Sequence, residues 1–405
     1  MKKNSSLFIL LLVGFVSAFG PFVTDFYLPC LPDLGKYFGT STSLIQLTLT
    51  VGLAGLALGQ LFIGPLSDRY GRKPLLMISL IFFVLSTLGC IFSGSITQLL
   101  VFRFIQGLTG AGGIVISRSI ATDLYEGREL ARFFSVLSSV QGIAPIGAPV
   151  LGGLMLLVTD WKGIFWTLLG IGAVLLIFTA YFRESLKVFG HESVIGVFRS
   201  YLPVMRNRVF TRYVWVQSMA MGVMFTYIAA SPFIFQVHFG VTPVVYSLCF
   251  GLNALGIMAG SLLVMRFRRT EKGLRIGTVS FFIMSIVVAF ILVAGLPVYF
   301  VEGAFFFLLF FLGMVLPTST TLAMEPVREN SGNASAILGF MSFLAGGICS
   351  PLAGLGNMLI STSILIVLCA TLTFIFVVRK QKRAVAEFQH YWTFVLNKLR
   401  LVSKL

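Results

Sequence analysis

The chain alternates long apolar runs with short polar connections. Charged residues, prolines or glycines bound twelve such runs, at 7–30, 43–64, 75–94, 98–121, 133–157, 162–182, 210–235, 243–265, 274–296, 298–324, 332–356 and 360–379. Each is long enough to cross a hydrocarbon core as a helix, which takes about 20 residues. Lipid cannot hydrogen-bond an open backbone, so helices are required. The pattern predicts an all-α polytopic membrane protein with twelve transmembrane helices.

Composition excludes an ordinary soluble domain. Hydrophobic residues make up 57% of the chain and charged residues 11%, with a mean hydropathy of +0.96. The net charge of +16 would favour nucleic acid in a soluble protein. Here the basic residues lie between apolar runs and form no patch with aromatic residues, so no nucleic-acid partner is expected. The five cysteines have no paired spacing, which argues against a metal motif and a disulfide framework.

The basic residues predict the orientation. Of the 30 lysines and arginines, 26 fall on one side of the expected membrane. The opposite connections hold Lys36 and Lys162, while Arg103 and Arg118 lie inside the fourth run. By the positive-inside rule, both termini are expected to face the cytoplasm of a bacterial inner membrane.

The longest internal connection divides the runs six and six. The expected parts are a first half (1–182), a linker (183–209), a second half (210–379) and a basic tail (380–405). Two six-helix halves are typical of transporters built from structural repeats, with a binding site between the halves. One chain holds a complete pathway, so a monomer is expected.

A charged segment at 64–74 separates the second and third runs and is expected to be a loop on the cytoplasmic surface. Its glycines permit close helix contact and a tight reversal, and its basic side chains can bind carboxylates, carbonyls or lipid phosphates. We expect a cytoplasmic gate between the halves here, with two residues from the end of the fourth run. The expected gate residues are Gly64, Asp68, Arg69, Gly71, Arg72, Lys73, Arg118 and Asp123.

Two opposite charges lie at similar depth inside the first and fourth runs. A charge at the bilayer centre costs roughly 2.5–3.5 kcal/mol, so it usually has a partner or a function. Asp25 and Arg103 each lie about 7–8 Å below the non-cytoplasmic surface at 1.5 Å per residue, which predicts that they pair. Arginine stays protonated, so Asp25 is the group that can bind and release a proton. The alternative is a permanent ion pair that clamps the two helices together.

Several motifs resemble known families. The pattern Gly64-x-Leu-x-Asp-Arg-x-Gly-Arg-Lys73 resembles the loop 2–3 signature of the major facilitator superfamily. The small residues and prolines of the fifth run resemble the antiporter motif of drug exporters; they are Gly142, Pro145, Gly147, Pro149, Gly152 and Gly153. Together with Asp25-x-Tyr-Leu-Pro and Arg103-Phe-x-x-Gly, these motifs resemble bicyclomycin-resistance-type drug/proton antiporters. The chain departs from that pattern at Thr122, where relatives often have a second arginine.

The resemblance implies a major facilitator fold and a proton-coupled secondary transporter. Such a protein would export drugs or small amphipathic metabolites by alternating access, with protons, lipids and a small molecule as its partners. The proton gradient would supply the energy and no cofactor would be needed. A proton-coupled importer or facilitator of a nutrient shares the fold and stays open as an alternative.

An enzyme is not expected, because the three histidines are dispersed and there is no phosphate-binding P-loop pattern. Polar residues within the runs are candidates for a substrate cavity. They are Tyr27, Gln106, Gln141, Gln217, Tyr227 and Glu302. The sequence leaves open whether Glu302 binds a cation or a proton, or reaches the lipid headgroups.

Overall fold

The computed structural model describes residues 5–125, 147–186 and 201–378, together with positions 129, 133, 144 and 145. Over these residues the chain is helical, as expected, with 11 helices long and apolar enough to cross a membrane. Positions 134–143 and 146 of the expected run at 133–157 lie outside the described residues, and its end at 147–155 is helical.

The elements have the following bounds. They are α1 (Ser6–Asp25), η1 (Leu28–Cys30), α2 (Leu31–Phe38), α3 (Thr42–Tyr70), α4 (Arg72–Ile91), α5 (Ile96–Leu124), α7 (Trp161–Tyr181), α9 (Arg208–Pro232), η2 (Phe233–His238), α10 (Pro243–Val264), α11 (Thr270–Val293), α12 (Val298–Met324), η3 (Glu325–Asn330) and α13 (Ser331–Ala353). A last helix covers Met358–Val378.

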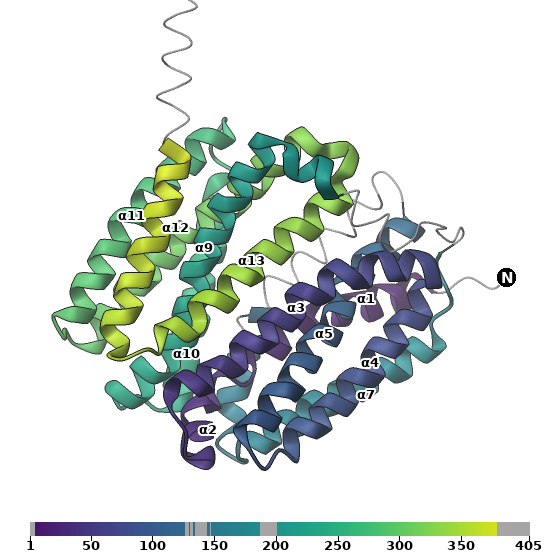
Figure 1. The fold of residues 1–405 in the computed structure, drawn as a ribbon, viewed down its shortest axis with the longest axis horizontal. Coiled ribbons are helices and arrows are strands. Elements are labelled where there is room, and N and C mark those ends of the chain that lie inside the picture. The colour runs from purple at the N-terminus through teal and green to yellow at the C-terminus, as the bar shows by residue number, and fades with distance from the viewer. Residues whose placement is uncertain are drawn as a thin grey trace, which may run out of the picture.

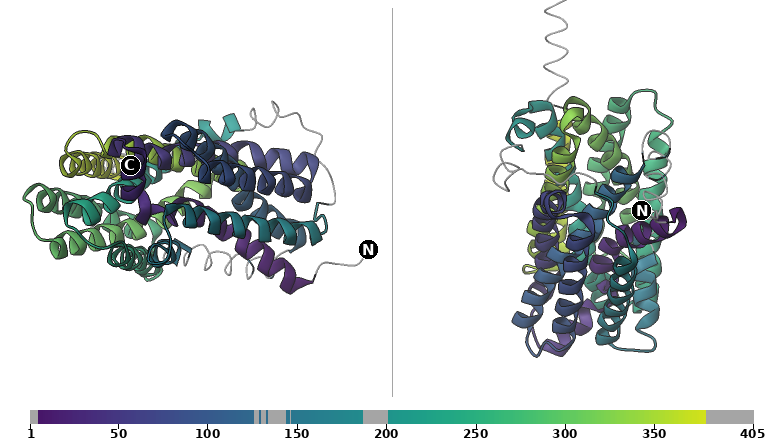
Figure 2. Two further views of the ribbon diagram at one scale, coloured as in Figure 1. Left: turned by 90° about the horizontal axis from the view of Figure 1, so that it is seen from below. Right: turned by 90° about the vertical axis from the view of Figure 1, so that its right-hand side faces the viewer.

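The helices form two bundles. Figure 1 shows α1, α3, α4, α5 and α7 in a first bundle and α9 to α13 in a second, with α3 packed against α13 between them. In the right-hand view of Figure 2 the helices run roughly side by side along one direction, as membrane spans do. Residues 187–200 and 379–405 are not described, so the expected limits of the linker and of the tail stay predictions.

The two ends of the bundles differ in charge. We call the end that carries Arg69, Arg72 and Arg269 the basic end, and it lies at the top of Figure 1. The end that carries α2, at the bottom of Figure 1, is the opposite end. Helix α3 runs from the opposite end to the basic end.

The expected loop at 64–74 is wrong. Helix α3 continues through Pro65 to Tyr70, and the reversal into α4 is made by one residue, Gly71, with a φ of 101°. The apolar run ends near residue 64. The helix continues beyond it because, at the membrane surface, a helical turn can carry charged side chains as well as apolar ones. Its last turn is closed by the Gly71 amide, which donates to the Ser67 carbonyl at 3.1 Å. A residue with a side chain rarely adopts such a φ.

The two bundles contact each other at the opposite end. The Ser43 hydroxyl donates to the Gly354 carbonyl at 2.6 Å, and the Gln46 amide donates to the Ala229 carbonyl at 2.9 Å. Next to them a pocket of about 810 Å³ lies between α2, η2 and the start of the last helix. These hydrogen bonds hold the first and second bundles together at this end.

Candidate functional site

Arg103 is fully buried in the first bundle, on α5. Its Nη1 donates to the Val23 carbonyl at 3.2 Å and to Oε1 of Gln106 at 2.5 Å. The guanidinium also lies 4.0 Å from the centroid of the Tyr27 ring, a cation–π contact. Arg103 is therefore held by a carbonyl, an amide and an aromatic face.

The expected Asp25–Arg103 ion pair is not formed. Among the described residues no cation lies within 4.0 Å of the Asp25 carboxylate, and Asp25 is 6% exposed. The reason is helical geometry. Val23 and Tyr27, four residues apart, share the face that meets Arg103, whereas Asp25 lies midway between them and points the other way.

Asp25 lies at the end of α1 that leads to the second bundle, because η1, which follows it, packs against α9 and α10. On those two helices, the Tyr246 hydroxyl is 3.2 Å from the Ser231 hydroxyl. A buried carboxylate at the boundary between two bundles is sensitive to any movement of one against the other.

The polar residues expected to line one cavity lie in three separate places. Tyr27 and Gln106 are fully buried around Arg103. Gln217 accepts hydrogen bonds from Ser319 at 2.9 Å and Thr320 at 2.6 Å, which ties α9 to α12. Tyr227 and Glu302 belong to a third cluster, within the second bundle, and Gln141 lies outside the described residues. Most of these side chains bond to neighbouring helices, and a role in a substrate cavity stays a prediction for them.

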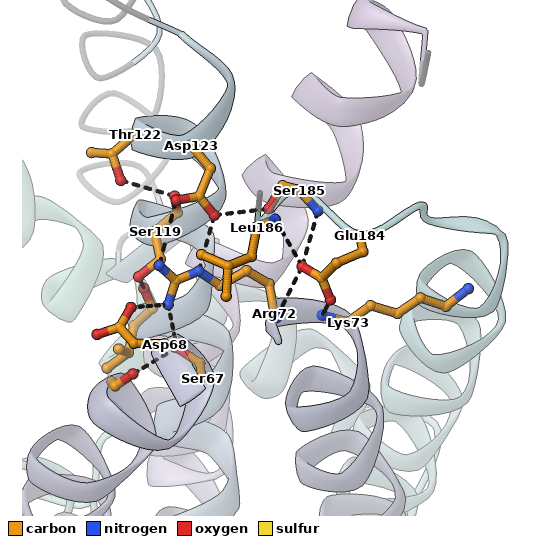
Figure 3. A network of polar contacts seen from close by, with 12 residues as sticks. Ser67, Asp68, Arg72, Lys73, Ser119, Thr122, Asp123, Glu184, Ser185 and Leu186 are labelled. Atoms are coloured by element: carbon orange, nitrogen blue, oxygen red, sulfur yellow. Dashed lines mark hydrogen bonds and ion pairs between the residues drawn. The ribbon is translucent and has the colours of Figure 1, made fainter. Parts of the chain in front are cut away.

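Arg72 is the centre of a polar network at the basic end (Figure 3). Its guanidinium contacts Asp68 of α3 at 2.5 Å, the Ser67 hydroxyl at 2.6 Å and Asp123 of α5 at 3.0 Å. The side chain is buried although its partner Asp68 is largely exposed. One arginine thus joins the ends of α3, α4 and α5.

Glu184, just after α7, completes this network and was missed by the sequence analysis. Its carboxylate accepts from the backbone amides of Arg72 at 3.1 Å and Lys73 at 3.0 Å, the first residues of α4 (Figure 3). Ser185 beside it donates to Asp123 at 2.9 Å. An acidic residue caps the amides of a helix N-terminus well. The available signal was a glutamate two residues after the end of the sixth run, beside Arg183.

The gate expected between the bundles is a network within the first bundle. Asp123 is bonded to Arg72 and Ser185, and Arg118 is exposed, with no ion pair among the described residues. Arg69 is exposed and lies 5.4 Å from the Tyr70 ring. The second bundle meets the first along the packing of α3 against α13.

Tyr201 lies within the expected linker (183–209), and it is the first residue that the structure describes after position 186. Its hydroxyl donates to the Leu61 carbonyl of α3 at 3.3 Å. Burial, with the nearby charge of Asp68, raises the pKa of the Tyr201 phenol. The segment that leads into the second bundle therefore rests against the basic end of α3.

Two adjacent glycines of the expected antiporter motif lie between the bundles. A Cβ on Gly152 would strike the Phe26 carbonyl oxygen of the first bundle. A Cβ on Gly153 would lie 2.9 Å from Ser247 Cβ and 3.1 Å from the Pro243 carbonyl oxygen, both of α10. Pro145, Gly147 and Pro149 are helical, and Gly142 lies outside the described residues. The glycine pair lets one helix approach both bundles closely.

Replacing Gly153 with alanine is expected to separate the bundles at the opposite end. Overpacking of a close contact costs about 1–3 kcal/mol, and this contact is between bundles, so they move apart rather than repack. Spin labels at Lys36 of α2 and Val237 of η2, both exposed, would report the distance in a background with the native cysteines replaced by serine. We expect a population at longer distance.

Gly147→Ala is the matched control, since no described atom lies within 4 Å of the added Cβ. Both substitutions raise the helix propensity of the same helix by about 1 kcal/mol. Equal distance distributions in the two variants would contradict the assignment of Gly153 to the contact between bundles.

Over the part of the chain that the structure describes, no group of three or more His, Cys, Asp or Glu side chains could hold a metal ion. The side chains with candidate chemistry are Asp25, Arg103 and those of the cluster around Glu302.

Comparison with known proteins assigns the chain to a family. A sequence model described as the Major Facilitator Superfamily matches residues 10–351. The chain is 38% identical over 354 residues to the uncharacterized MFS-type transporter YdgK of Bacillus subtilis (strain 168), which covers 85% of this chain and 88% of that protein. It is 28% identical over 364 residues to the bicyclomycin resistance protein homolog of Haemophilus influenzae, with 87% and 90% covered.

The fold is also found among solved structures. The crystal structure of a D-xylose–proton symporter covers 92% of this chain and 98% of its own, with a TM-score of 0.74 at 16% identity. These proteins are transporters, not enzymes, and the expected resemblance to bicyclomycin-resistance proteins is confirmed. This multi-pass membrane protein belongs to the Major Facilitator Superfamily.

Proposed function

We propose that the chain is a proton-coupled secondary transporter that exports drugs or small amphipathic metabolites across the bacterial inner membrane by alternating access. The observation that carries the proposal is Asp25, a buried carboxylate without a described cation at the boundary between the bundles. Such a group is stabilised by protonation when it is dry and by ionisation when it is wet. Movement of one bundle against the other changes its hydration and thereby binds or releases a proton.

Arg103 keeps its charge and acts on this equilibrium from the other face of α1. It is anchored through Val23 and Tyr27, which lie on either side of Asp25 in sequence. A movement of α1 therefore changes the distance between the fixed positive charge and the titrating carboxylate. In this proposal Asp25 carries the proton, and Arg103 tunes it without pairing with it permanently.

The orientation follows from the positive-inside rule. With the basic end in the cytoplasm, the contacts at the opposite end close the protein toward the outside, which corresponds to an inward-facing state. Asp68 and Arg69 are exposed at the basic end and are placed to meet the second bundle when that end closes. In this proposal the network around Arg72 is the half of the cytoplasmic gate that belongs to the first bundle. The gate closes when the second bundle reaches it.

Drug export is supported by relatedness and by the motif of the fifth run. The Haemophilus influenzae relative is named for bicyclomycin resistance. The glycine pair of the antiporter motif lies in the contact that closes the opposite end, which links the motif to the conformational cycle. The import of a nutrient on the same fold is the competing possibility.

The test uses everted membrane vesicles from a host that lacks its own drug pumps. Respiration acidifies the lumen, and a pH-sensitive dye reports the gradient while antibiotics and lipophilic cations are added one at a time. An exporter takes up its substrate in exchange for lumenal protons, so the gradient falls on addition of the substrate and not in vesicles without the protein. Substrate movement in the opposite direction, out of the lumen together with protons, would establish an importer and refute export.

A further inference from the structure

A second carboxylate lies inside the second bundle, in a cluster formed by three helices. Asn253 of α10 is 1% exposed, and its Nδ2 donates to Oε2 of Glu302 on α12 at 3.1 Å. The same Nδ2 donates to the Tyr227 hydroxyl of α9 at 2.9 Å. Tyr227 is also buried and packs against Phe250 and Phe305, so the cluster has an apolar wall.

The cluster has acceptors without donors. Oε1 of Glu302 and Oδ1 of Asn253 are both buried and have no hydrogen-bond partner among the described residues. Those residues supply no cation within 4.0 Å of Glu302 either. Glu302 in turn acts electrostatically on Tyr227, Tyr246 and Cys249, which are all neutral at ordinary pH.

We propose that Glu302, together with Asn253 and Tyr227, is a proton-binding site of the second bundle, distinct from Asp25. A largely enclosed carboxylate without a cation is costly, and its protonation removes the charge. The added proton also gives the carboxyl group a hydrogen that it can donate to a neighbouring acceptor.

Asn253 suits either protonation state. An amide rotated by 180° exchanges its donor and acceptor at nearly the same positions. In the orientation described above, Nδ2 donates to the ionised Glu302. In the rotated one, Oδ1 lies at that position and accepts from protonated Glu302 and from the Tyr227 hydroxyl. The Asn253 amide therefore changes its orientation when Glu302 gains or loses a proton.

The site shares its helices with the boundary between the bundles. Tyr246, on α10 like Asn253, lies 3.2 Å from the Ser231 hydroxyl of α9, and η1 of the first bundle packs against both helices. With Asp25 in the first bundle and Glu302 in the second, the transporter has two places for a proton. The assignment of Glu302 does not depend on the direction of transport or on the substrate.

The test is infrared difference spectroscopy of the purified protein in lipid nanodiscs, titrated with acid and base without any substrate. The carbonyl stretch of a protonated buried carboxyl group is resolved from that of carboxylates. We expect Glu302→Gln to remove one such band while Asp25→Asn removes another, so a failure of the Asp25 role leaves this result intact. Glu271→Gln is the matched control, since Glu271 is exposed at the start of α11 and its loss should leave the bands unchanged.

Asn253→Leu keeps the carboxyl and removes its hydrogen-bond partner, so the Glu302 band is expected to shift in frequency rather than vanish. This variant keeps the proposal testable if Glu302→Gln is poorly folded. A spectrum in which neither variant alters a protonated-carboxyl band overturns the proposal.

Discussion

Replacing Arg72 with alanine is expected to destabilise the protein by about 3–5 kcal/mol, the usual cost of removing one partner from a buried ion pair. Asp123, whose side chain is 14% exposed, would lose both hydrogen bonds that it accepts from the guanidinium. The Ser67 hydroxyl and Asp68 would lose their partner as well. The measurement is thermal unfolding of the purified protein in detergent.

Arg69→Ala is the matched control for charge. Arg69 is an exposed residue in the last turn of α3, three residues before Arg72 in the sequence. Its described contact is with the Tyr70 ring at 5.4 Å. An exposed cation–π contact contributes about 0.5–1 kcal/mol, so a small effect is expected. Arg72→Lys keeps the charge but loses the two-pronged contact with Asp123 and should fall between the two. Equal melting temperatures for Arg72→Ala and Arg69→Ala would refute the central position of Arg72.

The apolar runs predict the helices well because the membrane leaves a chain few choices. A run of about 20 apolar residues has to be helical and has to span. The same argument fails at the membrane surface, where helices are no longer required to be apolar. Helix α3 therefore extends to Tyr70, well past the apolar run, and α2 forms where a loop was expected after the first run.

The candidate site is harder to predict, because depth is readable from a sequence but the direction of a side chain between helices is not. Asp25 and Arg103 do lie on facing helices at similar depth, since Arg103 bonds the Val23 carbonyl. Which residues of α1 meet α5 depends on how the helix is rotated, and this rotation places Val23 and Tyr27 toward α5. The role of Glu184 depends on the end of α7 lying beside the start of α4, which no local pattern encodes.

Asp25→Asn is expected to abolish proton-driven export while leaving substrate binding intact. Asparagine is close in shape to a protonated aspartate, so the variant resembles a protein that has bound its proton and cannot release it. Substrate exchange across the membrane, which needs no net proton movement, should persist. Everted vesicles report the first quantity through the pH gradient, and counterflow of a labelled substrate reports the second.

Asp33→Asn is the control, because Asp33 is an exposed carboxylate eight residues further along, paired with Lys36 at 3.4 Å. Exposed pairs contribute little, so export should be unchanged in this variant.

The melting temperature of Asp25→Asn distinguishes a proton carrier from a structural ion pair. A buried carboxylate without a cation is a cost to the fold, so Asp25→Asn should leave the melting temperature unchanged or raise it. A clear fall in melting temperature would mean that Asp25 holds the helices together, and undiminished proton-driven export would mean that the coupling proton is carried elsewhere.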